Sequence, residues 1–281
     1  MSATTETPPV WRYWPASVAE IPLLVSIPHT GTFVPAEIVA QFAHKDIAAQ
    51  LMTDWALHEL YTFLPALGVD VIHATHHRFV IDLNRPPDAR PLYPGRFETG
   101  LVPTESFQGE PIWRRSPSAT EVGRRLERFH RPYHAALEQR LREKVARFGY
   151  AYLIDAHSVE SRASRLHGAL NEDIYLGDRD RATCDPAFTA RVSELFAAQG
   201  LQVSVNEPYK GGYITAHYCS LAGVQSLQIE MCQRLYMTEG QPERASADPR
   251  FAPFQQHLRL VFAGIAEIVR TPPVQTVPTR T

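Results

Sequence analysis

The sequence predicts an α/β fold, a three-layer sandwich in which helices cover both faces of a mixed, largely parallel sheet. Short apolar segments rich in β-branched residues alternate with longer helical patterns along the chain. Most of these segments are apolar at consecutive positions, which is typical of strands buried on both faces. The chain has 281 residues and 44% hydrophobic content, so it can bury a sizeable core.

Seven apolar segments are expected to form the strands of this sheet. They comprise residues 23–27, 69–74, 79–83, 151–156, 173–177, 201–205 and 224–231.

Helical periodicity starts at Asp46, where apolar residues near 3–4 spacing run through DIAAQLMTDWALHELYTFLPAL. A second helix is expected from Ser118, which forms a capping-box pattern with Glu121. Pro132 falls between two apolar stripes of this region and predicts a kink or a break. Further helices are expected at 185–199 and 251–269.

Two long stretches, 85–117 and 206–223, match neither pattern, and such connections in a compact domain are usually functional loops or lids. Residues 1–10 and 271–281 are rich in Pro and Thr and are expected to be flexible. Because no repeat or low-complexity linker divides the chain, we predict one domain over residues 1–281.

The composition narrows the class of partner. Lys and Arg number 28 against 30 Asp and Glu, with no block of like charge, which argues against nucleic acid or a membrane surface. No apolar run approaches the roughly 18 residues of a membrane span, and the start lacks a secretion signal. The three cysteines lack disulfide or zinc-knuckle spacing. These features favour a cytoplasmic protein that acts on small molecules, and they leave its oligomeric state open.

Polar residues stand at the ends of four predicted strands. They are His29, the pair Asn84 and Arg85, His157, and Glu230. In open α/β sheets the ligand crevice lies outside the carboxyl ends of the strands, so these side chains are expected to converge there.

Two histidines and a carboxylate form a typical catalytic zinc site with an open position for water. Zinc lowers the pKa of that water towards about 7 and polarises a carbonyl group. We therefore expect His29 and His157 to bind zinc, with Glu230 as the general base. A carboxylate inside an apolar strand end is rare unless it is paired or functional.

The third zinc ligand is predicted to be Asp54, a short acid within an otherwise apolar helical segment. Asp82 and Asp155 compete for that role, although either could instead orient a ligand histidine. The pair His76 and His77 is a further competitor, and a solvent-exposed turn is the favoured interpretation for it.

Arg85 is a candidate for bidentate binding of a substrate carboxylate, with Asn84 orienting the substrate or the arginine. Other catalytic signatures are missing from the sequence: there is no G-x-S-x-G elbow, Walker A loop or G-x-G-x-x-G fingerprint.

Several motifs together resemble the N-formylglutamate deformylase (N-formylglutamate amidohydrolase) family. They are SIPHTG, TDWAL, DLNRPPD, LYPG, HRPYH, IDAHS, NEPYKGGYIT and LQIEM, in that order from about Pro22 to about Glu239. The resemblance implies hydrolysis of N-formyl-L-glutamate to L-glutamate and formate, a last step in one route of histidine degradation. It also implies a phosphorylase/hydrolase-like fold related to zinc carboxypeptidases.

Those distant relatives bind zinc through an H-x-x-E motif and a later histidine. Here His29 is followed by Thr30, Gly31 and Thr32, so the relatives' glutamate is absent and Asp54 is the expected substitute. The implied reaction is attack of zinc-bound water on the formyl carbon, with Glu230 as general base.

The substrate implied by the resemblance is a small dicarboxylate, so a second group besides Arg85 is expected to bind it. The candidates are Arg162, and Lys210 with Tyr213, while the glycines at 211 and 212 allow close approach. One alternative is a zinc deacylase for another N-acyl or N-formimidoyl acidic amino acid. A non-catalytic module that binds an acidic metabolite is the other alternative.

Overall fold

A computed structural model describes residues 7–44, 47, 52–92, 95 and 98–272. The expected flexibility of the termini concerns mainly residues 1–6 and 273–281, which lie outside the described residues. Within the described residues the strands are β1 (Trp11–Trp14), β2 (Leu23–Ile27), β3 (Asp70–Ala74), β4 (Ala151–Val159), β5 (Ile174–Gly177), β6 (Val203–Val205) and β7 (Val224–Cys232).

The α-helices are α1 (Ala36–Val39), α2 (Leu57–Leu60), α3 (Ala119–Arg125), α4 (Arg131–Phe148), α5 (Pro186–Ala197), α6 (Tyr213–Tyr218) and α7 (Phe251–Val269). Short 3-10 helices occur at η2 (Leu64–Leu67), η4 (Gln233–Leu235) and η5 (Pro242–Ala247), and a π-helical segment, η3 (Leu126–His130), joins α3 to α4.

The seven strands form one mixed sheet in the order β1-β3-β2-β4-β7-β5-β6. Four neighbouring pairs are parallel, and only the β1–β3 and β5–β7 pairs are antiparallel. The prediction of a mixed, largely parallel sheet is therefore confirmed. The long parallel pairing of β4 with β7 runs over nine residues on each strand and sets the centre of the sheet.

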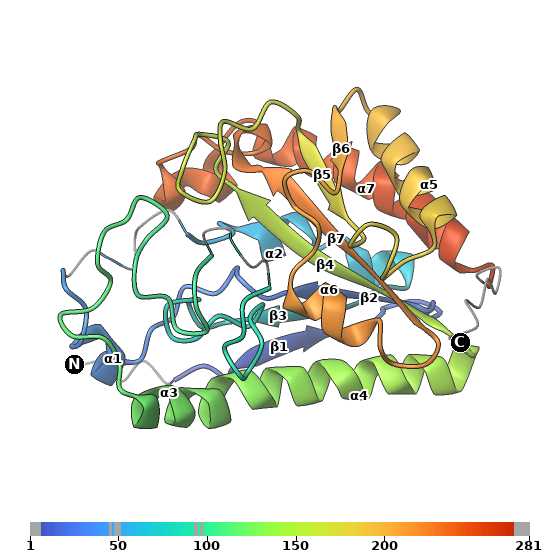
Figure 1. Cartoon of the computed structure of the whole chain (residues 1–281). Coiled ribbons are helices and arrows are strands. Elements are labelled where there is room, and N and C mark those ends of the chain that lie inside the picture. Colours follow the sequence, from blue (N-terminus) through green and yellow to red (C-terminus); the bar gives the residue numbers. More distant parts are fainter. Residues whose placement is uncertain (1–6, 45–46, 48–51, 93–94, 96–97, 273–281) are drawn as a thin grey trace, which may run out of the picture.

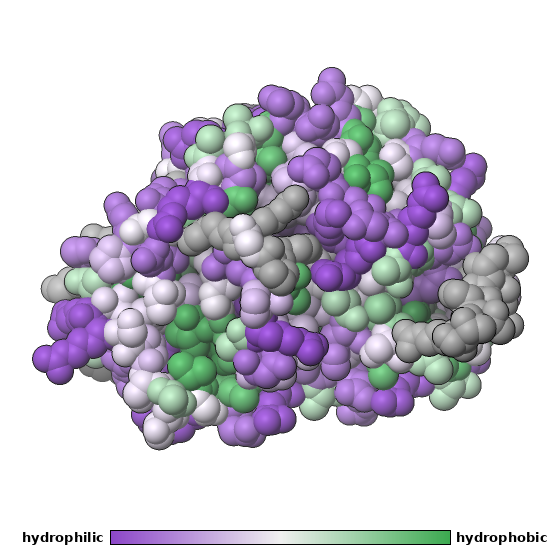
Figure 2. All heavy atoms as spheres, viewed as in Figure 1, coloured by the Kyte–Doolittle hydropathy of each residue, from purple (hydrophilic) through white to green (hydrophobic). Residues whose placement is uncertain are grey.

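Helices cover both faces of the sheet, so that it is the middle layer of three (Figure 1). One face packs against α2, α5 and α7, and the other against α1, α4 and α6. Side chains along β2 alternate between the two faces of the sheet. Val25 packs in the apolar cluster with α2, α5 and α7, and Leu24 packs in the cluster with α1, α4 and α6. The outer surface viewed in Figure 2 is mostly hydrophilic, with apolar residues in small groups.

The longest amphipathic patterns gave correct predictions. Helix α7 has the predicted bounds, 251–269, and α5 covers 186–197 of the predicted 185–199. The hydroxyl of Ser118 caps α3 by accepting a hydrogen bond from the backbone N–H of Glu121. Of the kink or break predicted at Pro132, a break is not found, because α3, η3 and α4 follow one another directly and Pro132 lies in the first turn of α4, where proline is tolerated. The irregularity at this point is the π-helical segment η3, directly before α4.

Residues 79–83 do not form the predicted strand. They lie in a turn after β3, and their apolar side chains are buried against the helices on one face rather than between two layers of helices. The backbone N–H of Asp82 bonds to the carbonyl of Leu101 at 2.7 Å, and the N–H of Val80 bonds to the carbonyl of His77 at 2.9 Å. Hydrophobicity here marks a buried turn, not a strand.

The long helix predicted from Asp46 is also wrong where the structure describes it. Residues 46 and 48–51 lie outside the described residues, and 52–56 form turns, so the helical part is limited to α2 and the 3-10 helix η2. Ala56 adopts a left-handed conformation with φ of 52° directly before α2, which prevents a continuous α-helix. Strand β1, in turn, was not predicted.

The described residues of the two unassigned stretches differ. The 206–223 stretch contains α6, whereas 85–117 has no helix or strand among its described residues. In the described ranges, no helix combines the length and the apolar character needed to cross a bilayer.

Candidate active site

The carboxyl ends of three adjacent parallel strands supply the first half of the site. His29 follows β2, while His157 and Glu230 lie near the ends of β4 and β7 and are direct partners in the register of that pair. Asp155 and Gln228 stand two residues earlier on the same two strands, so their side chains share that face. The strand pairing alone therefore gathers four polar side chains on the α4 side of the sheet.

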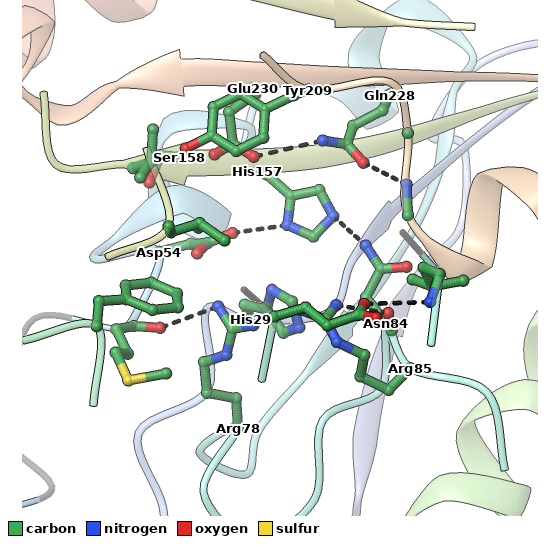
Figure 3. Close-up of a pocket in the computed structure, with 18 of the residues that line it drawn as sticks. His29, Asp54, Arg78, Asn84, Arg85, His157, Ser158, Tyr209, Gln228 and Glu230 are labelled. Carbon is green, nitrogen blue, oxygen red and sulfur yellow. Dashed lines mark hydrogen bonds and ion pairs between the residues drawn. The ribbon is translucent and has the colours of Figure 1, made fainter. Parts of the chain in front are cut away.

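The second half of the site comes from the buried turn that follows β3. Figure 3 shows Arg78, Asn84 and Arg85 reaching the same cavity as the strand-end residues. The Asn84 amide donates to Oδ2 of Asp155 at 3.0 Å, and its oxygen accepts from the N–H of Ile214 at 2.8 Å. The turn is thereby tied both to β4 and to α6.

Close approach of α6 to this turn requires Gly212. A Cβ atom at this position would lie 2.4–2.6 Å from the side chain of Asn84, closer than atoms can approach. The N–H of Gly212 also donates to Oε1 of Gln228 at 2.8 Å. Gly212 thus allows the close approach that was expected of the glycine pair, and the group that approaches it is the side chain of Asn84.

Asp82 orients His29. Its Oδ1 lies 2.7 Å from Nε2 of the imidazole, and its Oδ2 accepts from Arg78 at 2.5 Å. Burial would raise the pKa of Asp82, but Arg78 and His29 outweigh it and hold that pKa well below its ordinary value. Burial and then Arg78 lower the pKa of His29. The imidazole is therefore neutral, donates from Nε2 to Asp82, and keeps a lone pair on Nδ1.

His157 lies between two carboxylates. Its Nδ1 is 3.1 Å from Oδ2 of Asp54, and its Nε2 is 3.1 Å from Oδ2 of Asp155. Burial alone would lower the pKa of His157, but Asp155 and Asp54 outweigh it and raise the pKa well above its ordinary value. This position therefore stabilises positive charge.

Asp54 reaches the site from a turn and not from a helix. Its backbone N–H donates to the carbonyl of His29 at 3.1 Å, which fixes the turn against the end of β2. The preceding residue, Thr53, contacts Nε2 of His77 at 2.7 Å and accepts at its carbonyl from Gln233 at 2.9 Å. These contacts replace the predicted helical hydrogen bonds.

The interpretation of His76 and His77 as a solvent-exposed turn is wrong. Both are buried, with exposed fractions of 6% and 0%. Burial lowers the pKa of His77 to about 3, so its ring stays neutral and supports the Asp54 turn through Thr53.

His29, Asp54 and His157 form a buried group that could hold a metal ion. One ligand atom from each lies within 4.8 Å of the others, and each residue is 3% exposed. Two imidazoles and a carboxylate are a donor set that suits zinc in a catalytic site. Asp82 contacts Nε2 of His29, and Asp155 contacts Nε2 of His157. A carboxylate on one ring nitrogen fixes the orientation of a histidine whose other nitrogen binds a metal. The donor set and its supports therefore fit a divalent cation.

Glu230 lies in the same cavity without belonging to this group. Burial raises its pKa to about 8, with His157 acting in the opposite direction. Its Oε2 is 3.4 Å from the amide nitrogen of Gln228. A carboxyl group with a pKa near neutrality is suited to accept and return a proton.

Two arginines give the cavity positive charge. Arg78 is 7% exposed, and its Nε atom is buried and makes no hydrogen bond with a described residue. Arg85 donates from Nε to the carbonyl of Thr99 at 2.6 Å and from a terminal nitrogen to the Thr99 hydroxyl at 3.1 Å. Both line the cavity, so both are near enough to an acidic ligand to contact it.

Three residues predicted to bind substrate do not line this cavity. Arg162 has a side chain that is 62% exposed and forms an ion pair with Glu160. Lys210 pairs with Asp180 at 2.7 Å, and Tyr213 stacks on His217 with ring centroids 4.9 Å apart. The structure thus brings together His29, Asp54, Asn84, Arg85, His157 and Glu230 around the cavity. It places Arg162, Lys210 and Tyr213 outside the cavity lining.

Among the lining residues that the sequence interpretation missed are Arg78, Tyr209 and Gln228. Gln228 could have been found, because it precedes Glu230 by two positions and therefore shares its face of the strand. Tyr209 adjoins the singled-out Lys210. Nothing local distinguishes Arg78 from a surface arginine, since its role depends on contacts with Met52 and Asp82.

Comparisons with known proteins match nearly the whole described fold. Residues 21–237 match the family model described as N-formylglutamate amidohydrolase. The chain is 38% identical over 254 residues to an N-formylglutamate deformylase of Pseudomonas putida, covering 88% of this chain and 94% of the relative. It is 39% identical over 232 residues to the Pseudomonas aeruginosa protein of the same name, covering 81% and 86%. A crystal structure of an N-formylglutamate amidohydrolase from Ralstonia eutropha JMP134 superposes with a TM-score of 0.79 at 30% identity, covering 93% of this chain and 98% of that one.

Proposed function

Because the chain belongs to the N-formylglutamate amidohydrolase family, we propose that it hydrolyses N-formyl-L-glutamate to L-glutamate and formate with the help of a divalent metal ion. The observation that carries the proposal is the single cavity that contains the His29, Asp54 and His157 group beside Glu230. This combination supplies both a cation site and a proton acceptor for hydrolysis of an amide.

His29, Asp54 and His157 would hold the metal, for which zinc is the best match to the donor set. A bound divalent ion supplies Lewis acidity, which polarises a carbonyl group and makes water more acidic. Nδ1 of His157 lies 3.1 Å from Oδ2 of Asp54, and a histidine binds a metal only through an unprotonated nitrogen, so metal binding would release a proton from the His157 imidazolium.

Glu230 would move the proton during the reaction. It accepts a proton from water as the water oxygen bonds to the formyl carbon, and it gives that proton to the amide nitrogen as the C–N bond breaks. The raised pKa of Glu230 suits both steps, since the carboxyl group must gain the proton and lose it again near neutral pH. The products are formate and the free amine of glutamate.

The two substrate carboxylates would be bound by Arg78 and Arg85. The buried Nε of Arg78 has a hydrogen to donate, and its guanidinium lies 5.5 Å from the centroid of the Phe107 ring, which fixes its orientation. Asn84 would position other protein groups rather than bind substrate, through its hydrogen bonds to Asp155 and to the first turn of α6.

Metal analysis coupled to formate release tests the proposal. The purified protein is expected to contain about one zinc per chain and to release formate from N-formyl-L-glutamate faster than from N-acetyl- or N-formimidoyl-glutamate. Faster cleavage of either alternative would reassign the substrate. Binding of L-glutamate without turnover of any of the three would indicate a binding module.

The assignment of Arg78 can be tested against Arg162, which lies outside the cavity. Arg78→Gln is expected to raise KM for N-formyl-L-glutamate by at least about tenfold, because a charged hydrogen bond to a carboxylate is lost. Arg162→Gln is expected to leave KM unchanged. The reverse outcome would return the role of carboxylate binding to Arg162.

A further inference from the structure

Tyr209 is a cavity residue that the proposed chemistry has not used. Its ring packs edge-on against Tyr175 and His167, with centroids 5.8 Å away in each case. Its hydroxyl is buried, makes no hydrogen bond with any described residue, and belongs to a side chain that lines the cavity with Glu230 and Asp54. A buried hydroxyl without a partner is costly, which suggests that its partner is a ligand.

The segment that carries Tyr209 is anchored on both sides. Asn206 exchanges hydrogen bonds with Asp178, including one from its amide to the carboxylate at 2.7 Å. The carbonyl of Lys210 accepts from the N–H of Arg179 at 2.7 Å. The Lys210–Asp180 ion pair lies on the same side, so Lys210 contributes to anchoring this segment.

A close backbone contact completes the anchoring. Gly177, at the end of β5, approaches Gly211 so closely that a Cβ atom on Gly177 would lie 2.5 Å from the Gly211 nitrogen. Because the backbone on either side of Tyr209 is fixed, its hydroxyl is held in place before substrate binds. Such pre-organisation is what a hydrogen-bond donor in catalysis requires.

The surroundings of the Tyr209 hydroxyl define what it can do. Burial and then the charge of Glu230 raise its pKa well above its ordinary value, so it remains a protonated donor. The acceptor must therefore come from the ligand. Figure 3 shows Tyr209 beside Glu230 and His157, at the reacting end of the cavity and away from the arginines. The formyl oxygen is the substrate acceptor at that end.

We propose that Tyr209 donates a hydrogen bond to the formyl oxygen and stabilises the negative charge that develops there as water adds to the carbon. This inference rests on the proposed function, because it assigns a further catalytic residue to that reaction. A donor of this kind acts mostly in the transition state, since the oxygen gains charge as the carbonyl double bond is lost.

Tyr209→Phe tests this role by removing a single oxygen atom. We expect kcat for N-formyl-L-glutamate to fall about 10²–10³-fold with little change in KM, as for other donors to a developing oxyanion. L-Glutamate carries both carboxylates but no formyl group, so its inhibition constant should stay at the wild-type value. Metal content and the melting temperature should also be preserved, because the hydroxyl makes no hydrogen bond to a described residue.

Tyr175→Phe is the matched control, since its ring contacts Tyr209 but its hydroxyl donates to Glu172 outside the cavity. It should keep kcat near the wild-type value. An unchanged kcat in Tyr209→Phe overturns the proposal, as does an equal loss in both variants. A raised KM and a raised inhibition constant for L-glutamate would place Tyr209 on a carboxylate instead. If the wild type itself releases no formate, the proposed function has failed.

Discussion

Two buried polar clusters lie at opposite ends of the central parallel strands, and they differ in how their hydrogen-bonding capacity is used. At the amino ends, Nζ of Lys144 contacts Glu20 at 2.7 Å, Asp70 at 2.9 Å and the carbonyl of Ile21 at 3.0 Å. Asp70 in turn accepts from the N–H of Ala16 at 2.7 Å. All three ammonium hydrogens thus have partners within the protein.

The cluster at the carboxyl ends is not closed in this way. Nε of Arg78 and the hydroxyl of Tyr209 are buried without a hydrogen-bond partner among the described residues, and both residues line the cavity. Burial of charge is therefore common to a structural cluster and a candidate catalytic one. What separates them is whether the polar atoms are satisfied by the protein or by something that binds to it.

Removing a metal ligand should have the largest effect on the cavity cluster. In His29→Ala and His157→Ala we expect metal content to fall from about one ion per chain to near zero, with formate release at background, because two remaining ligands bind zinc weakly. Elemental analysis of the purified variants measures this directly. His44→Ala removes an exposed histidine and serves as the control. Full metal content in both ligand variants would remove the proposed site.

Glu230→Gln should separate proton transfer from metal binding. We expect kcat to fall about 10²–10⁴-fold because the amide cannot accept a proton, while metal stoichiometry stays near the wild-type value. The exposed Glu207→Gln, on a neighbouring loop, should change neither quantity. Loss of metal together with activity would make Glu230 a ligand and not a base.

The sequence predicted the residues of this cavity better than the elements that carry them. His157 and Glu230 could be placed because they close long apolar strands, and the parallel pairing brings such positions together. The amphipathic patterns of α5 and α7 were equally reliable, because each has one clear apolar face.

The incorrect strand at 79–83 and the incorrect helix through Asp54 share one physical cause, which is that burial in a turn gives the same apolar pattern as burial in a regular element. The apolar side chains of residues 79–83 pack in the cluster with α1, α4 and α6. Asp54 lies in a turn that is fixed by hydrogen bonds to His29 and Gln233. Local patterns do not contain those contacts. Arg78 was missed for the same reason, since its partner Asp82 was interpreted as part of a strand.

Lys144→Met should affect stability and spare catalysis, in contrast with the cavity variants. It leaves the carboxylates of Asp70 and Glu20 without their cation, and breaking a buried ion pair in this way costs about 3–5 kcal/mol in the free energy of unfolding. Urea denaturation measures the loss, and kcat and KM of the folded variant should match the wild type. A substantial fall in kcat would show that the two ends of the sheet are coupled.

The smallest effect on stability is expected from substitution of His73, a buried histidine of β3 that belongs to neither cluster. Its ring lies 4.7 Å from that of Trp14 and 5.0 Å from that of His58, and its Nε2 has no hydrogen-bond partner among the described residues. Burial, then the nearby charges of His58 and, more weakly, Arg12, lower its pKa to about 4.

In the unfolded chain His73 would titrate near 6.5, so between about pH 6.5 and 4 the unfolded state binds more protons than the folded state. The free energy of unfolding therefore falls as pH is lowered through this window, by about 1.4 kcal/mol per pH unit at most for one such group. His73→Phe fits between the same rings and abolishes this contribution, so its stability should depend less steeply on pH than that of the wild type. Urea denaturation at pH 7, 6, 5 and 4.5 measures the slopes, and identical slopes in His73→Phe and wild type would show that His73 is not the group that titrates.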